Sequence, residues 1–160
     1  ETLRMLEPYI DVYLPDFKYS NDTIAFNMSG IKNYVATALA AIKEMYYQKG
    51  NTLQLNSKNE IERGLIIRHL VLPNHIENSL NVLDIIEQEI SPRVALSLMS
   101  QYYPPENLTL PHEISRKIKF NEYNNVIQYM HELGMNKGWI QDFESTDFYK
   151  PNFNKEHPFE

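Results

Sequence analysis

The sequence of 160 residues contains no cysteine. Disulfide bonds, thiolate zinc sites, cysteine nucleophiles and cysteine-held iron–sulfur clusters are therefore excluded within this chain. Glycine is also scarce, with five residues, and these form neither a glycine-rich phosphate loop nor a nucleophile elbow. Several common catalytic centres are thus absent from the chain itself.

Positive charge is limited, because 15 Lys and Arg residues face 21 Asp and Glu residues and the formal net charge is -6. Binding along a phosphate backbone needs clustered cations, so we expect no nucleic acid partner. No apolar run approaches the roughly 20 residues that span a bilayer, and the N-terminus lacks a signal-peptide pattern. We therefore expect a cytoplasmic protein with no membrane partner.

The stretch IDVYLPDFKY, residues 10–19, predicts a strand that ends in ligand-binding groups. Its period of two places four side chains on one face, namely Val12, Leu14, Asp16 and Lys18. This face begins apolar and ends charged. Such a gradient is typical of strands in parallel α/β sheets, where ligands bind at the carboxyl ends.

Helices and strands alternate along the rest of the chain. Apolar residues at helical spacing predict helices, and short aliphatic runs predict strands buried on both faces. The predicted helices span 22–29, 35–49, 77–90 and 120–133, the predicted strands after the first span 65–72, 94–99 and 138–141, and 51–59 is expected to be a polar loop.

This order of elements predicts βαβ units with right-handed crossovers and a parallel sheet. The length allows one domain with a real core. Three full units correspond to half of a (β/α) barrel or to a small open sheet.

Polar groups interrupt each main strand at or beyond its middle: Asp16 with Lys18, then Arg68, then Gln101. If the strands are parallel neighbours, these side chains converge at one rim. Lys18 and Arg68 suit a carboxylate or phosphate, Asp16 accepts from an amine, and the amide of Gln101 does either. The set would fit a zwitterion such as an amino acid group.

Each of these residues also has a purely structural interpretation. In this interpretation Asp16 and Lys18 form an ion pair at the end of the strand, and Gln101 is a loop residue. Arg68 lies within an aliphatic run, where a buried guanidinium demands an anion. That anion is either a ligand or a structural carboxylate of the chain.

The histidines of this region do not predict a metal site. His69 and His75 are six residues apart across a turn at Pro73, which is a poor spacing for zinc or iron ligands. Because side chains alternate along a strand, His69 is expected to face the helices, away from Arg68.

Four segments together resemble a known family: DVYLPDFKY with SGIKNY, GLIIRHLVLPNHIENS, VALSLMSQYYP and ELGMNKGWIQ. In this order they are similar to the C-terminal half of radical S-adenosylmethionine proteins related to pyruvate formate-lyase activating enzyme. The likeness covers roughly residues 1–141, and its most specific motifs are D-x-K, I-R-x-x-V-x-P and S-L-M-x-Q-Y. It implies an α/β fold that is the parallel-stranded second half of a partial (β/α)6 TIM-like barrel at 1–142, followed by a tail at 143–160.

The resemblance implies an oxidoreductase chemistry for the parent protein. In this family a [4Fe-4S] cluster, held by a C-x3-C-x2-C loop, reductively cleaves S-adenosylmethionine to methionine and a 5′-deoxyadenosyl radical. By position, Asp16, Lys18 and Arg68 match residues near the methionine end of that cofactor. Gln101 stands where the activase has a histidine, and Asn74 stands where relatives often have glycine, which suggests a change in the turn.

The cysteine loop and the Gly-Gly-Glu-Pro strand of the family are absent from this chain. The resemblance therefore implies a C-terminal fragment that binds no cofactor and is inactive alone. Its expected partners are the missing N-terminal half of the barrel and a glycyl-radical enzyme or another protein substrate. Because a half-barrel exposes a strand edge, a homodimer through that edge is also expected.

Two other functions remain open. Lys18 with Asp16 two residues before it is also an aldolase-like arrangement, in which the lysine forms a Schiff base with a carbonyl substrate. Alternatively, the chain is a non-enzymatic module that binds anions or a partner protein.

Overall fold

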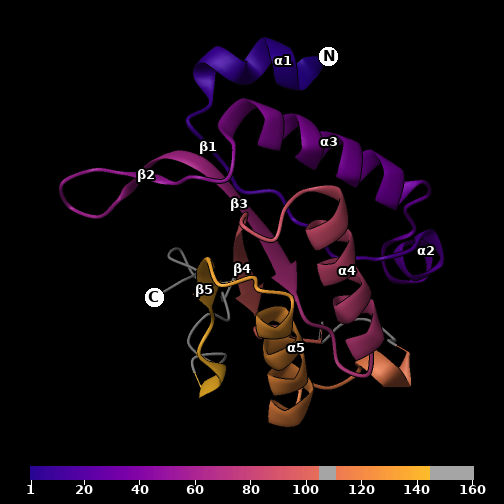
Figure 1. The fold of residues 1–160 in the computed structure, drawn as a ribbon. Coiled ribbons are helices and arrows are strands. Elements are labelled where there is room, and N and C mark those ends of the chain that lie inside the picture. The colour runs from indigo at the N-terminus through magenta and orange to yellow at the C-terminus, as the bar shows by residue number, and fades with distance from the viewer. Residues whose placement is uncertain (105–110, 145–160) are drawn as a thin grey trace, which may run out of the picture.

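The computed structural model describes residues 1–104 and 111–144, so most of the expected tail lies outside the described residues. The helices are α1 (Thr2–Leu6), α2 (Asp22–Ser29), α3 (Tyr34–Lys49), α4 (Ile76–Glu89) and α5 (Phe120–Glu132), with 3-10 turns η1 (Glu7–Tyr9) and η2 (His112–Ile114). The strands are β1 (Val12–Tyr13), β2 (Gln54–Leu55), β3 (Ile61–Leu70), β4 (Ala95–Met99) and β5 (Gly138–Ile140). Figure 1 shows their arrangement.

The main sheet is parallel and has the order β1-β3-β4-β5. Helix α4 connects β3 to β4, and helix α5 connects β4 to β5. The three long helices α3, α4 and α5 lie on the same side of the strands (Figure 1). The predicted α/β class with a parallel sheet is therefore confirmed.

The segment that connects α3 to β3 differs from the prediction of a polar loop. Gln54–Leu55 forms β2, which pairs antiparallel with a β3 that begins at Ile61. The turn of this hairpin is held by Asn56, whose Oδ1 accepts from the backbone N–H of Glu60, and by Asn59 with a φ of 62°. Polar side chains predicted a loop here, but the ladder uses backbone groups, which composition does not reveal.

The ends of α2 follow from their residues. The Oδ1 of Asn21 accepts from the backbone N–H of Ile24, which satisfies one free donor of the first turn. Gly30 ends the helix with a φ of 67°, a left-handed conformation that favours glycine. Asn21 and Gly30 therefore fix the two ends of α2.

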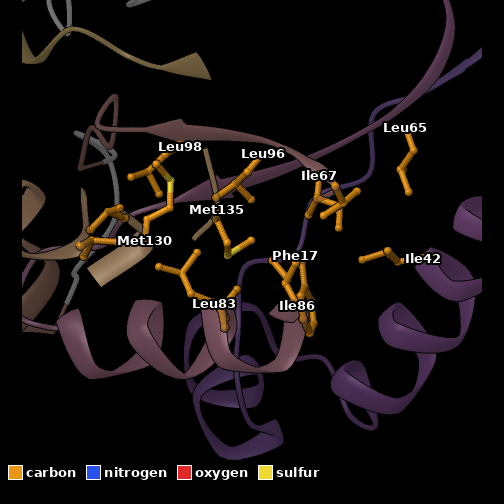
Figure 2. Close-up of a cluster of buried hydrophobic side chains, with 14 of the residues drawn as sticks. Phe17, Ile42, Leu65, Ile67, Leu83, Ile86, Leu96, Leu98, Met130 and Met135 are labelled. Atoms are coloured by element: carbon orange, nitrogen blue, oxygen red, sulfur yellow. The ribbon is translucent and has the colours of Figure 1, made fainter. Parts of the chain in front are cut away.

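The core lies between the sheet and the long helices (Figure 2). Alternate strand residues point into it, whereas their neighbours point to the opposite face. Its fully buried side chains include Phe17, Leu65, Ile67, Leu83, Ile86, Leu96, Leu98, Val126 and Met135. Each large apolar side chain buried in this way contributes roughly 2 kcal/mol to folding.

His69 is fully buried on the face of β3 that points to the helices. Its Nδ1 donates to the carbonyl oxygen of Phe17 at 2.7 Å, because a carbonyl only accepts, and its Nε2 lies 2.9 Å from the hydroxyl of Ser79. Burial lowers the pKa of His69 to about 4, so the ring is neutral near pH 7. The prediction that His69 faces the helices, away from Arg68, is confirmed.

No helix within residues 1–104 and 111–144 is long and apolar enough to cross a membrane.

Acid should destabilise the fold through His69 before the carboxylates titrate. The unfolded chain takes up a proton near pH 6.5, whereas the folded chain resists it down to about pH 4, so stability falls as the pH drops through this interval. We expect the free energy of unfolding to fall by about 2 kcal/mol between pH 7.5 and 5. Urea unfolding at each pH measures this loss. The His69→Gln variant should be less stable than the unchanged chain, but its free energy of unfolding should fall much less between pH 7.5 and 5.

Gly138 is required by close packing of β5 on β4. Its φ is 115°, and a Cβ at this position would overlap the backbone of Leu96. Gly134 also has a positive φ, 73°, but faces open space. We expect Gly138→Ala to lower the free energy of unfolding by about 3 kcal/mol or more, against about 1 kcal/mol for Gly134→Ala. Equal losses in urea unfolding would contradict this account.

Candidate functional site

A row of four residues crosses the sheet on the face that points away from the core. Asp16 is paired with Arg68, Arg68 with Ser97, and Ser97 with Trp139. Because directly paired residues of adjacent parallel strands point to the same face, these side chains share one surface. Trp139 is half exposed, and the sequence analysis did not single it out.

Asp16 contacts a different cation with each carboxylate oxygen. Its Oδ2 lies 3.2 Å from Nζ of Lys18, and its Oδ1 lies 2.7 Å from Nε of Arg68. The three side chains are between 31% and 43% exposed, so solvent and ligands reach them. The structure thus contains the strand-end ion pair, and the anion beside Arg68 is a carboxylate of the chain.

The contact between Asp16 and Arg68 is close but poorly aligned. Asp16 Oδ1 and Arg68 Nε are both buried atoms, and neither has a hydrogen-bond partner with proper geometry among the described residues. The pair therefore attracts mainly through charge, and both atoms retain capacity for a hydrogen bond. With Lys18 included, two cations share one carboxylate, so the group carries an excess positive charge.

Gln101 is not part of this group. Its side-chain oxygen accepts from Nε2 of Gln141 at 3.3 Å, and its Nε2 lies 3.7 Å from Sδ of Met99. Arg68 pairs with Ser97, which precedes Gln101 by four residues in the chain. Four residues of extended strand span about 13 Å. Of the four predicted residues, the structure brings together Asp16, Lys18 and Arg68 and leaves Gln101 beyond the end of β4.

Gln141 is a polar residue at this rim that the sequence analysis missed. It directly follows β5, and its Oε1 accepts from the backbone N–H of Ser100 at 3.0 Å. The hydroxyl of Tyr123 contacts the carbonyl oxygens of Gln141 and Leu98. Its position at the carboxyl end of the predicted strand 138–141 is the sequence signal that could have identified Gln141.

A second network ties the loop after β3 to the start of α5. Both guanidinium ends of Arg116 donate to Glu122, at 2.7 and 2.8 Å, and the backbone N–H of Asn74 donates to Glu122 at 2.9 Å. The guanidinium of Arg116 and the backbone N–H groups of Asn74 and Lys119 lower the pKa of Glu122 to about 2. Asn74 has a φ of 59°, a conformation that asparagine tolerates, so the turn forms without glycine.

The described residues contain no group of three or more His, Cys, Asp or Glu side chains arranged to hold a metal ion. His75 contacts the carbonyl oxygen of Pro73, and both ring nitrogens of His69 have partners within the chain.

Comparison with known proteins gives one distant relative. An uncharacterized protein of Methanocaldococcus jannaschii is 28% identical over 129 residues, which are 80% of this chain and 33% of the relative. The chain therefore spans about a third of the length of that protein. No family model matches the sequence, and no solved structure matches it.

The two carboxylates of these networks should differ in their contribution to stability. Asp16→Asn removes two partly exposed ion pairs and should change the free energy of unfolding by less than about 1 kcal/mol. Glu122→Gln breaks a bidentate contact with Arg116 and should cost about 2 kcal/mol. Urea denaturation at pH 7 measures both, and an equal cost would mean that the Asp16 group serves mainly to hold the fold.

Proposed function

We propose that this chain is the C-terminal part of a radical S-adenosylmethionine enzyme and that Asp16, Lys18 and Arg68 bind the amino acid group of S-adenosylmethionine. The observation that carries the proposal is that two cations share one carboxylate at the carboxyl ends of two adjacent parallel strands. A zwitterion matches this group, because its carboxylate adds the missing negative charge.

The residues fit the amino acid end of the ligand through their charges. Lys18 and Arg68 would neutralise the ligand carboxylate, and Asp16 would accept from its ammonium group. The side chains of Lys18 and Arg68 are 41% and 43% exposed, so a ligand carboxylate can reach both cations. These residues bind and orient the ligand and transfer no proton themselves.

An iron–sulfur cluster does not fit this chain, because the sequence has no cysteine. In the proposed enzyme the cluster lies in a different segment and supplies the electron for cleavage of S-adenosylmethionine. This chain alone should therefore be inactive. Cysteines in C-x3-C-x2-C spacing encoded upstream of Glu1 would support the proposal over a separate binding module.

The proposed partner for the sheet is the N-terminal half of the same barrel. Strand β1 pairs with β3 and lies at the end of the sheet path, so its other edge is open among the described residues. An open edge beside half-exposed Leu14 favours pairing with a further strand. Without that half, a second copy would occupy the edge, and a glycyl-radical enzyme remains a predicted substrate.

A Schiff-base enzyme is less well supported. Nζ of Lys18 lies 3.2 Å from the carboxylate of Asp16 in an ion pair, and the ammonium form of lysine is not a nucleophile. The aldolase-like function also leaves Arg68 without a role. Borohydride trapping of a carbonyl substrate on Lys18 would favour it.

Titration calorimetry of the chain with S-adenosylmethionine tests the proposal. Lys18→Met and Arg68→Gln should each weaken binding about tenfold or more, because each removes a charge-assisted hydrogen bond. Binding of adenosine, which lacks the amino acid group, should be unchanged.

The matched control is Lys58→Met, because Lys58 is an exposed lysine of the turn between β2 and β3. This variant should bind like the unchanged chain. Equal binding by the Arg68→Gln variant, or reductive cleavage of S-adenosylmethionine by this chain alone, would contradict the proposal.

A further inference from the structure

Lys18 lies just beyond the point where the sheet ladder ends. The last ladder bond in this segment runs from the backbone N–H of Phe17 to the carbonyl oxygen of Arg68 at 2.9 Å. The following backbone groups, from the carbonyl of Phe17 to that of Lys18, have no strand partner. Lys18 therefore needs another means of fixation if its ammonium is to have a defined position.

Three side chains supply the bonds that the ladder no longer makes. His69 donates to the carbonyl oxygen of Phe17 at 2.7 Å, and the hydroxyl of Tyr34 accepts from the N–H of Lys18 at 2.8 Å. Asn78 donates to the carbonyl oxygen of Lys18 at 2.9 Å. Each of the three successive backbone groups after the ladder thus has one side-chain partner.

The three partners come from different elements and are themselves fixed. His69 and Asn78 are buried, on β3 and α4 respectively. Asn78 also accepts from the backbone N–H of Ser20 at 2.8 Å, so its side chain bonds to the backbone on both sides of Tyr19. Tyr34, the first residue of α3, packs its ring against Phe17, with ring centroids 6.3 Å apart.

Polar side chains buried at this depth cost free energy unless they are bonded. The buried His69 and Asn78 and the part-buried Tyr34 all bond to the backbone around Lys18, whose own side chain points to the open face beside Asp16.

We propose that Tyr34, His69 and Asn78 are positioning residues that hold the backbone of Lys18 so that its ammonium meets the carboxylate of an amino acid ligand. The inference rests on the proposed function for the identity of that ligand. The three residues do not contact the carboxylate of Asp16 and act through the backbone on either side of Lys18, where Tyr34 also donates to the backbone carbonyl of Asp16 at 3.4 Å and Asn78 also accepts from the N–H of Ser20.

The test is Tyr34→Phe, which removes one hydroxyl and keeps the packed ring. It should weaken binding of S-adenosylmethionine about fivefold in calorimetry, since the N–H of Lys18 loses its partner. The matched control is Tyr129→Phe, which removes a hydroxyl bonded to Asp84 between α4 and α5 and should leave binding unchanged.

A double-mutant cycle separates positioning from a general loss of structure. In a chain that already carries Lys18→Met, Tyr34→Phe should weaken binding less than about twofold further, because the residue it positions is gone. An undiminished fivefold effect in that background would overturn the proposal.

A measurement without ligand keeps this inference distinct from the proposed function. After reductive ¹³C-methylation of lysines, the NMR signal of Lys18 should shift in the Tyr34→Phe variant, while that of Lys58 should not. If the chain binds no S-adenosylmethionine but the Lys18 signal moves, the proposed ligand is wrong and the positioning role stands. If the Lys18 signal stays unchanged, the positioning role is overturned.

Discussion

The register of β3 between β1 and β4 is the constraint on which both the core and the candidate site depend. Along this strand Ile67 and His69 point to the helices, whereas Arg68 points to the opposite face, level with Asp16 and Ser97. A shift of one residue would exchange these faces and place the guanidinium in the apolar core, at a cost of several kcal/mol. The apolar residues that stabilise the fold therefore also fix where the cations lie.

The buried polar residues follow from the same constraint. Strand β1 has a short ladder, yet the chain continues beside α4 with backbone groups that have to be satisfied. His69, Ser79 and Asn78, all buried, lie where that ladder ends. Their neutral hydrogen bonds satisfy the backbone at modest net gain and define one geometry for the segment that carries Lys18.

Sequence patterns predicted the alternation of helices and strands, because periodicity reports burial directly, and they placed Arg68 and His69 on opposite faces. They did not predict β2, whose pairing uses backbone groups, or the position of Gln101, which depends on where β4 ends. Asp16 and Arg68 are 52 positions apart in the sequence. The sequence pattern alone left open whether the anion beside Arg68 is a ligand or a carboxylate of the chain. Trp139 was missed because its row is defined by register across four strands.

Two arginine–carboxylate contacts of this chain differ in geometry and exposure. Arg116 meets Glu122 through two short, aligned bonds, and backbone N–H groups complete the carboxylate, as expected where a contact holds two segments together. Arg68 meets Asp16 closely but without alignment, in a group that solvent reaches. Partly exposed ion pairs contribute little to stability, so folding alone does not account for two cations around one carboxylate. The excess positive charge at the carboxyl ends of these parallel strands is what the proposed ligand carboxylate would neutralise.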